Sequence, residues 1–193
     1  MNSDEPFTRH YSVIGTSSTV LKIIFFVAGS IGIVYVSRTA LRDPRAHGFW
    51  RFFAWETILL LALLNVEQWF VDPFSIHQII SWLLLIASLF LILHGVHLLR
   101  VIGQPQGPIE NTTHLVIIGA YKYIRHPLYA SLLYLAWGVF FKDLTWLGAS
   151  LAVGTTAFLI ATARVEEAEN LHKFGDEYAQ YMRRTKMFVP FVL

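Results

Sequence analysis

Long apolar runs separated by short polar segments dominate the chain. Uncharged or nearly uncharged runs occupy residues 20–36, 52–71, 79–99, 128–141 and 144–163. A helix needs about 20 mostly apolar residues to cross the hydrocarbon of a bilayer. The pattern therefore predicts an all-α integral membrane protein with about five transmembrane helices. The fourth run is short for a crossing and is followed by Lys142-Asp143, so we expect it to form a tight helical hairpin with the fifth.

The tail after the last apolar run has the pattern of two amphipathic helices. Residues 164–174 place apolar and charged side chains on different helical faces. Gly175 is expected to end this helix, and Asp176 suits the N-cap of a second, shorter one. The tyrosines of the second helix, Tyr178 and Tyr181, are expected to lie at the membrane interface.

The connection between the third and fourth apolar runs is rich in helix-breaking residues. Residues 103–108 contain two glycines and two prolines, which predict a loop. His126-Pro127 then predicts a helix start, because proline costs no hydrogen bond at the first helical position. The free N–H groups of such a start, beside Arg125, would favour a carboxylate. Arg125 could equally be a simple anchor at the membrane edge.

Basic residues collect in alternate connections, which predicts the orientation in the membrane. Short cytoplasmic loops hold an excess of Lys and Arg, and by parity three basic segments share one face. We therefore expect the N-terminus outside and the C-terminus in the cytoplasm. These segments carry Arg38, Arg42, Arg45 and Arg51, then Arg100, Lys122 and Arg125, and finally Arg164, Lys173, Arg183, Arg184 and Lys186.

Composition limits the remaining possibilities. The 193 residues, 55% hydrophobic and 15% charged, predict a single membrane domain over residues 1–193, with a helical scaffold in 1–100 and the chemistry in 101–193. The absence of cysteine excludes thiolate nucleophiles and cysteine-metal sites. The net charge of +2 is explained by topology, so no nucleic-acid partner is expected. His94 and His97 lack a clear third ligand, so no metal is expected either.

Two polar motif blocks flank the last two apolar runs. The first is Gly119-x-Tyr121 followed by Arg125-His126-Pro127-x-Tyr129. Together with the second block, it resembles the isoprenylcysteine carboxyl methyltransferase family, within the wider group that includes phospholipid methyltransferases. The resemblance covers roughly residues 111–193. The second block consists of Glu166-Glu167, Leu171, Phe174-Gly175, Glu177-Tyr178, Tyr181 and Pro190.

This resemblance implies an integral-membrane enzyme that uses S-adenosylmethionine at a cytoplasmic active site. It also implies that the enzyme is not a Rossmann-type methyltransferase, and the chain has no Gly-x-Gly-x-x-Gly motif. Gln106 is a further candidate for cofactor contact, with Gln104 as its competitor. The resemblance implies cofactor contacts from Thr113, His114, Leu115, Val116, Tyr121, His126, Pro127, Leu128, Tyr129 and Glu167.

Helix geometry favours Glu167 over Glu166 as the partner of the cofactor ammonium. Arg164, Glu167 and Leu171 lie at i, i+3 and i+7 and share a face, whereas Glu166 points about 100° away. Both glutamates could instead be solvated residues of an interfacial helix. We predict that Arg164 orients the carboxylate of the methyl acceptor, since an arginine near the glutamate pair has this role in the family.

The predicted reaction is methylation of the α-carboxylate of an isoprenylcysteine-type substrate. The expected partners are this lipophilic methyl acceptor and membrane lipid. An ionised carboxylate needs no general base, whereas a neutral amine nucleophile would need His126 or a tyrosine as base. The alternatives are a phospholipid or small-amine N-methyltransferase, a nicotinamide-dependent enzyme similar to sterol reductases, and a non-enzymatic membrane protein.

Overall fold

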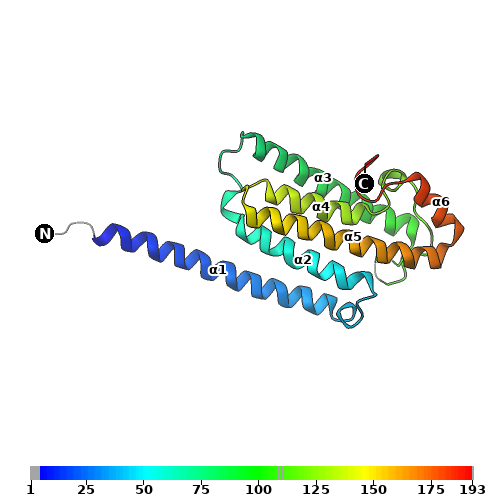
Figure 1. The fold of residues 1–193 in the computed structure, drawn as a ribbon, viewed down its shortest axis with the longest axis horizontal. Coiled ribbons are helices and arrows are strands. Elements are labelled where there is room, and N and C mark those ends of the chain that lie inside the picture. The colour runs from blue at the N-terminus through cyan, green and yellow to red at the C-terminus, as the bar shows by residue number, and fades with distance from the viewer. Residues whose placement is uncertain (1–4, 108, 110, 193) are drawn as a thin grey trace.

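The computed structural model describes residues 5–107, 109 and 111–192, with side chains described from Ser18 onward. Helices dominate this part of the chain (Figure 1), and the described residues contain no strand beyond one isolated parallel bridge between Ile124 and Lys186. The α-helices are α1 (Glu5–Ser37), α2 (His47–Leu64), α3 (Ile76–Leu98), α4 (Pro127–Phe140), α5 (Trp146–Phe174) and α6 (Asp176–Arg184). Short turns of 3-10 or π helix are η1 (Ala40–Arg42), η2 (Val66–Gln68), η3 (Leu99–Gly103) and η4 (Gly119–Lys122).

Three helices in the described chain are long and apolar enough to cross a membrane: Ser18–Ser37 of α1, Ile76–Gly103 and Trp146–Phe174. α4 is apolar but has only 14 residues, and α2 has 18 residues including Arg51 and Glu56. The prediction of an all-α integral membrane protein is confirmed. The count of five spans stays a prediction.

Helices α2 to α5 pack into a bundle, and α1 lies along α2 and projects beyond it (Figure 1). Gly138 of α4 lets α3 approach closely, because a Cβ there would lie 3.0 Å from Leu85. Hydroxyl groups of α3 add hydrogen bonds across this contact: Ser81 donates to the Gly138 carbonyl at 2.6 Å, and Ser88 to the Ser131 carbonyl at 2.7 Å. Small residues and such polar contacts are typical of helix association in lipid.

The carboxylates of the second apolar run hold α1 against α2. Ser30 of α1 donates to Glu56 at 2.6 Å, and Lys22 of α1 lies 2.9 Å from Glu67. No side chain in the membrane-spanning window of α1 is buried within the protein. We conclude that α1 contacts the bundle through a narrow, partly polar seam and turns its remaining apolar surface to lipid.

The helix predicted over residues 164–174 is the C-terminal part of α5, which continues without interruption from the fifth apolar run to Phe174. Residues 155–174 contain no glycine or proline, so the change from apolar to charged side chains alters the surroundings of the helix without ending it. Gly175 ends α5 as predicted, with φ of +56°. It also takes the N-cap position of α6, so Asp176 is the first helical residue rather than the cap.

The predicted hairpin of α4 and α5 is confirmed, and a buried lysine closes it at the end of the bundle remote from α6 (Figure 1). Lys142 is only 2% exposed. Its ammonium donates to Gln78 Oε1 at 3.0 Å and lies 3.6 Å from the centre of the Trp82 ring. A cation over an indole face is stabilised electrostatically, which allows this charge to be buried without a carboxylate.

Candidate active site

The site begins at the N-terminus of α4, where the two motif blocks meet. Pro127 is the first residue of α4, so the helix starts where the sequence predicts. The chain that follows α6 runs beside the residues before α4: Arg125 N–H donates to the Lys186 carbonyl at 2.7 Å, and His126 N–H to the Met187 carbonyl at 3.2 Å. Phe188, fully buried, packs edge-on against the His126 ring. These backbone bonds fix both blocks in one rigid unit.

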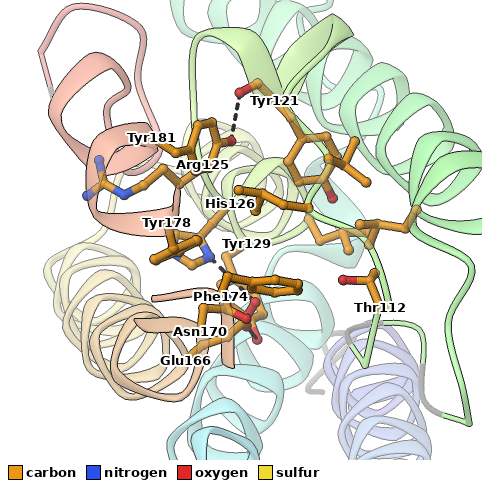
Figure 2. A pocket seen from close by; sticks show the side chains of 14 residues that line it. Thr112, Tyr121, Arg125, His126, Tyr129, Glu166, Asn170, Phe174, Tyr178 and Tyr181 are labelled. Carbon is orange, nitrogen blue, oxygen red and sulfur yellow. Dashed lines mark hydrogen bonds and ion pairs between the residues drawn. The ribbon is translucent and has the colours of Figure 1, made fainter. Parts of the chain in front are cut away.

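A narrow cavity lies between these blocks, with a volume of about 50 Å³. Figure 2 shows its side chains converging from the chain around η3, η4 and α4 on one side and from α5 and α6 on the other. Aromatic side chains make up much of the wall, and charged groups are placed among them. The lining residues are Leu99, Thr112, Leu115, Val116, Tyr121, Arg125, His126, Leu128, Tyr129, Glu166, Asn170, Phe174, Tyr178 and Tyr181.

A buried ion pair lies at one side of the cavity. Arg125 Nε donates to Glu167 Oε1 at 2.6 Å, and His126 Nε2 lies 3.2 Å from the same oxygen. Arg125 also donates through Nη1 to the Thr185 carbonyl at 2.5 Å. Both charged side chains are 10% exposed. Arg125 is therefore not a simple membrane anchor: it connects α5 to the chain that follows α6.

Glu166 contributes a second carboxylate, which faces the cavity. The Tyr129 hydroxyl donates a short hydrogen bond to Glu166 Oε2, and His126 Nδ1 lies 3.8 Å from Glu166 Oε1. The rings of His126 and Tyr129 stack with their centres 5.5 Å apart. The result is an imidazole held between two carboxylates, with a phenol hydrogen-bonded to the one that lines the cavity.

Tyr178 and Tyr181 of α6 are buried in the protein, which corrects their prediction as membrane-interface residues. The Tyr181 hydroxyl donates to the Tyr121 carbonyl at 2.6 Å and so fixes α6 against η4. Burial raises the pKa of both phenols well above the usual value near 10. These side chains therefore remain neutral at physiological pH and act as hydrogen-bonding, aromatic walls.

The structure brings six of the predicted cofactor-contact residues to the cavity: Leu115, Val116, Tyr121, His126, Leu128 and Tyr129. Pro127 shapes the α4 start behind the wall, and Glu167 lies in the ion pair with Arg125. Glu166, rather than the Glu167 that helix geometry favoured, lines the cavity. The exposed side chains of Gln104, Gln106, Thr113 and His114 lie outside the lining, as does exposed Arg164.

Four residues that the sequence did not mark as site residues also line the cavity: Leu99, Thr112, Asn170 and Phe174. A signal for two of them was present, because Glu166, Asn170 and Phe174 recur at i, i+4 and i+8 and share a helix face. Leu99 and Thr112 carry no comparable signal. They reach the cavity only because η3 and the following loop fold back against η4 and α5.

Metal ligands do not gather in the described part of the chain, where no group of three or more His, Cys, Asp or Glu could hold an ion. His94 stacks on Phe90 with ring centres 5.4 Å apart. His94 also lies close to Gly119, where an added Cβ would come within 2.5 Å of its Nε2. This histidine is therefore part of the packing behind η4.

The fold and site define a helical membrane protein with an enclosed aromatic and charged pocket at one end of its bundle. The sequence profile described as Phospholipid methyltransferase matches residues 76–177, which include α3, α4, α5 and most of the cavity wall. The chain therefore belongs to the phospholipid methyltransferase family, a family of membrane methyltransferases. The predicted resemblance is confirmed at this level.

Several characterised relatives are methanethiol S-methyltransferases. The chain is 30% identical over 116 residues to methanethiol S-methyltransferase 1 of Bradyrhizobium diazoefficiens. This match spans 57% of the chain and 39% of that protein. The chain is 25% identical to the enzyme of Pseudomonas deceptionensis and 26% identical to that of Mycobacterium tuberculosis, over 58% of the chain in each case. The matches span 42% and 46% of these two relatives, so the chain covers less than half of their length. No solved structure matches the chain significantly.

Proposed function

We propose that the protein is an S-adenosylmethionine-dependent methyltransferase whose acceptor is a small, membrane-soluble thiol. The observation that carries the proposal is the convergence of both motif blocks on one cavity, with Glu166 in its wall. Relatives that act on methanethiol support a thiol acceptor. The narrowness of the cavity, about 50 Å³, also favours a small acceptor over a bulky one.

The residues around the cavity fit the chemical groups of S-adenosylmethionine. Tyr121, Tyr129 and Phe174 offer aromatic surfaces to a sulfonium cation. Glu166 offers a carboxylate to the ammonium, and the N–H groups at the start of α4 suit a carboxylate or hydroxyl. S-Adenosylmethionine supplies an electrophilic methyl carbon when it is bound.

If the acceptor is a thiol, His126 is the residue that accepts its proton. The thiolate is the nucleophilic form. Even a cysteine thiol, with a pKa near 8.5, is mostly protonated at neutral pH, so an acceptor thiol must lose its proton. His126 lines the cavity and is held between Glu166 and Glu167, which stabilise the imidazolium formed when it accepts this proton. The sulfur lone pair forms the new S–C bond, and the electrons of the broken bond remain on S-adenosylhomocysteine.

An isoprenylcysteine carboxylate is the second candidate acceptor, supported by the resemblance of both motif blocks to that family. Arg164, predicted to orient the carboxylate, is exposed and lies outside the cavity lining. Arg125 is already bound to Glu167 and Thr185. The narrow cavity and the engagement of Arg125 make this acceptor second to a thiol.

The test compares donor binding and acceptor choice in detergent-solubilised protein. Calorimetry with S-adenosylhomocysteine should give saturable binding that weakens at least tenfold in Glu166→Gln, because a charge-assisted hydrogen bond is lost. Glu177→Gln, exposed on α6, is the matched control. Labelled methyl groups should pass to a small alkyl thiol faster than to a prenylcysteine or an amino-lipid. Absence of binding to the unmodified protein, or preferential methylation of another acceptor, would contradict the proposal.

A further inference from the structure

A second, larger cavity opens beside the first. Its volume is about 590 Å³, and we call it the vestibule. It lies between the start of α2 with η1 on one side and the C-terminal part of α5 on the other, and it reaches the N-terminal part of the chain that the family profile leaves unmatched. Its lining consists of Thr39, Ala40, Asp43, Ala46, His47, Gly48, Arg51, Asn111, Glu166, Glu169, Asn170 and Lys173.

Glu166 and Asn170 line both cavities and therefore form the partition between them. Figure 2 shows these two side chains near each other at one edge of the narrow cavity. Binding sites for ligands of the size of S-adenosylmethionine occupy roughly 300–1,000 Å³. The narrow cavity falls far below this range and the vestibule lies within it. A donor that places its methyl group near His126 must therefore use the vestibule for much of its length.

The vestibule carries charges of both signs. Three carboxylates, Asp43, Glu166 and Glu169, face the same space as three basic side chains, His47, Arg51 and Lys173. A phosphate or another pure anion would meet repulsion from the carboxylates. A group that carries an ammonium and a carboxylate on the same carbon atom finds a partner for each. The chemistry of this space therefore fits an α-amino acid better than an anion.

The side chains that line the vestibule keep hydrogen-bonding capacity for an α-amino acid beyond their present contacts. Lys173 donates one hydrogen bond to Asn111 Oδ1 at 2.8 Å, and an ammonium has three donors. Glu166 Oε2 accepts from Tyr129, while Oε1 lies 3.8 Å from His126. His47 and Glu169 bind one another at 2.8 Å across the vestibule, from α2 to α5. Lys173 is thus the cation placed to take a carboxylate, and Glu166 the carboxylate placed to take an ammonium.

From this arrangement we infer that the vestibule binds the amino-acid end of S-adenosylmethionine, with Lys173 on its carboxylate and Glu166 on its ammonium. The sulfonium then lies near the partition, with its methyl group on the His126 side. This inference rests on the proposed function. It extends the donor site to Lys173 and to the start of α2, and it assigns Asn170 as a residue that contacts the donor near its sulfur.

The experiment uses two probes that differ only in the amino-acid end. S-Adenosylhomocysteine carries it, whereas 5′-methylthioadenosine has a methyl group in its place. Calorimetry on the full-length protein should show that Lys173→Ala weakens S-adenosylhomocysteine binding about tenfold, the loss of one charge-assisted hydrogen bond. The same change should leave the Kd of 5′-methylthioadenosine unaltered. Arg184→Ala, an exposed basic residue of α6 outside both cavities, is the control and should alter neither Kd.

Each other outcome has a distinct meaning. Equal weakening of both probes by Lys173→Ala would show a general structural role and overturn the inference. No change with either probe would also overturn it. If neither probe bound the unmodified protein, the proposed function itself would fail. A Lys173→Arg variant that retained most of the affinity for S-adenosylhomocysteine would support the assignment of a positive charge at this position.

Discussion

Arg125 and Glu167 form a buried ion pair. Their side chains are each 10% exposed and are joined at 2.6 Å, with His126 3.2 Å from the same carboxylate oxygen. Removing one member of a buried pair leaves the other charge without compensation, which costs more than the pair itself contributes. The pair therefore holds α5 and the chain after α6 together behind the cavity.

We expect Arg125→Gln to lower the free energy of unfolding by about 3–5 kcal/mol, because Glu167 would be left buried and unpaired. The double change Arg125→Gln with Glu167→Gln should recover part of this loss. Chemical unfolding in detergent measures the free energy of unfolding of the single and the double variant. Lys122→Gln, at an exposed position on the same segment, is the control. A single change that costs no more than the control would show that the pair does not stabilise the fold.

For single residues, the sequence predicted which side chains belong to the site better than it predicted how they are oriented. His126 and Tyr129 could be singled out because polar groups beside apolar helices require polar partners. The sequence could not show that Glu166 rather than Glu167 lines the cavity, because this depends on how α5 is rotated against α4. Ala130 of α4 and Ala163 of α5 belong to one buried core cluster, and such tertiary packing is not encoded in a local pattern.

Among the elements, the short turn η4 is the most tightly constrained. Gly119 has φ of +59°, and a Cβ there would approach His94 Nε2 to 2.5 Å and Leu98 Cδ1 to 2.7 Å. A side chain at this position therefore meets both backbone strain and direct overlap. Because Tyr121 follows two residues later and lines the cavity, movement of η4 changes the site.

Gly119→Ala and Gly107→Ala form a matched pair. Both positions have positive φ, but a Cβ at Gly107 meets nothing within 4 Å. The strain of a left-handed alanine should cost about 1–2 kcal/mol in each, and overlap should cost Gly119→Ala a further 1–3 kcal/mol or so. Thermal unfolding with and without S-adenosylhomocysteine measures stability and binding together. Equal losses in the two variants would contradict a close approach between η4 and α3.

Helix positions were largely predictable, because apolar runs, Pro127 and Gly175 mark them directly. At Arg164 the side chains change from apolar to charged, but α5 continues. An α-helix that leaves the bilayer keeps its own hydrogen bonds, so only a glycine, a proline or a lost packing partner ends it. The burial of Tyr178 and Tyr181 was missed, since the docking of α6 is a tertiary contact.

For the whole molecule, the basic connections lie together at one end. The α1–α2 turn, the chain between α3 and α4, and α6 share the end that holds the cavity, while the α2–α3 and α4–α5 turns share the other (Figure 1). This arrangement agrees with the parity from which the orientation was predicted. Which end faces the cytoplasm stays a prediction based on the positive charges.

The natural absence of cysteine makes this orientation directly testable. A cysteine at Phe74, 89% exposed in the α2–α3 connection, should react with an impermeant maleimide on intact cells. A cysteine at Arg184, exposed on α6, should react only after permeabilisation. The reverse pattern would reverse the orientation. Identical labelling of both positions on intact cells would contradict a membrane between the two ends.

The shortness of α4 has a consequence for how an acceptor arrives. Its 14 residues extend about 21 Å at about 1.5 Å per residue, against a hydrocarbon thickness of about 30 Å. If the Lys142 end lies at one boundary of the bilayer, the first turn of α4 would lie beneath the opposite headgroups, at the depth of the acyl chains. Apolar solutes partition into that layer, so the bilayer would serve as a reservoir that delivers acceptor at a concentration well above that in the surrounding water.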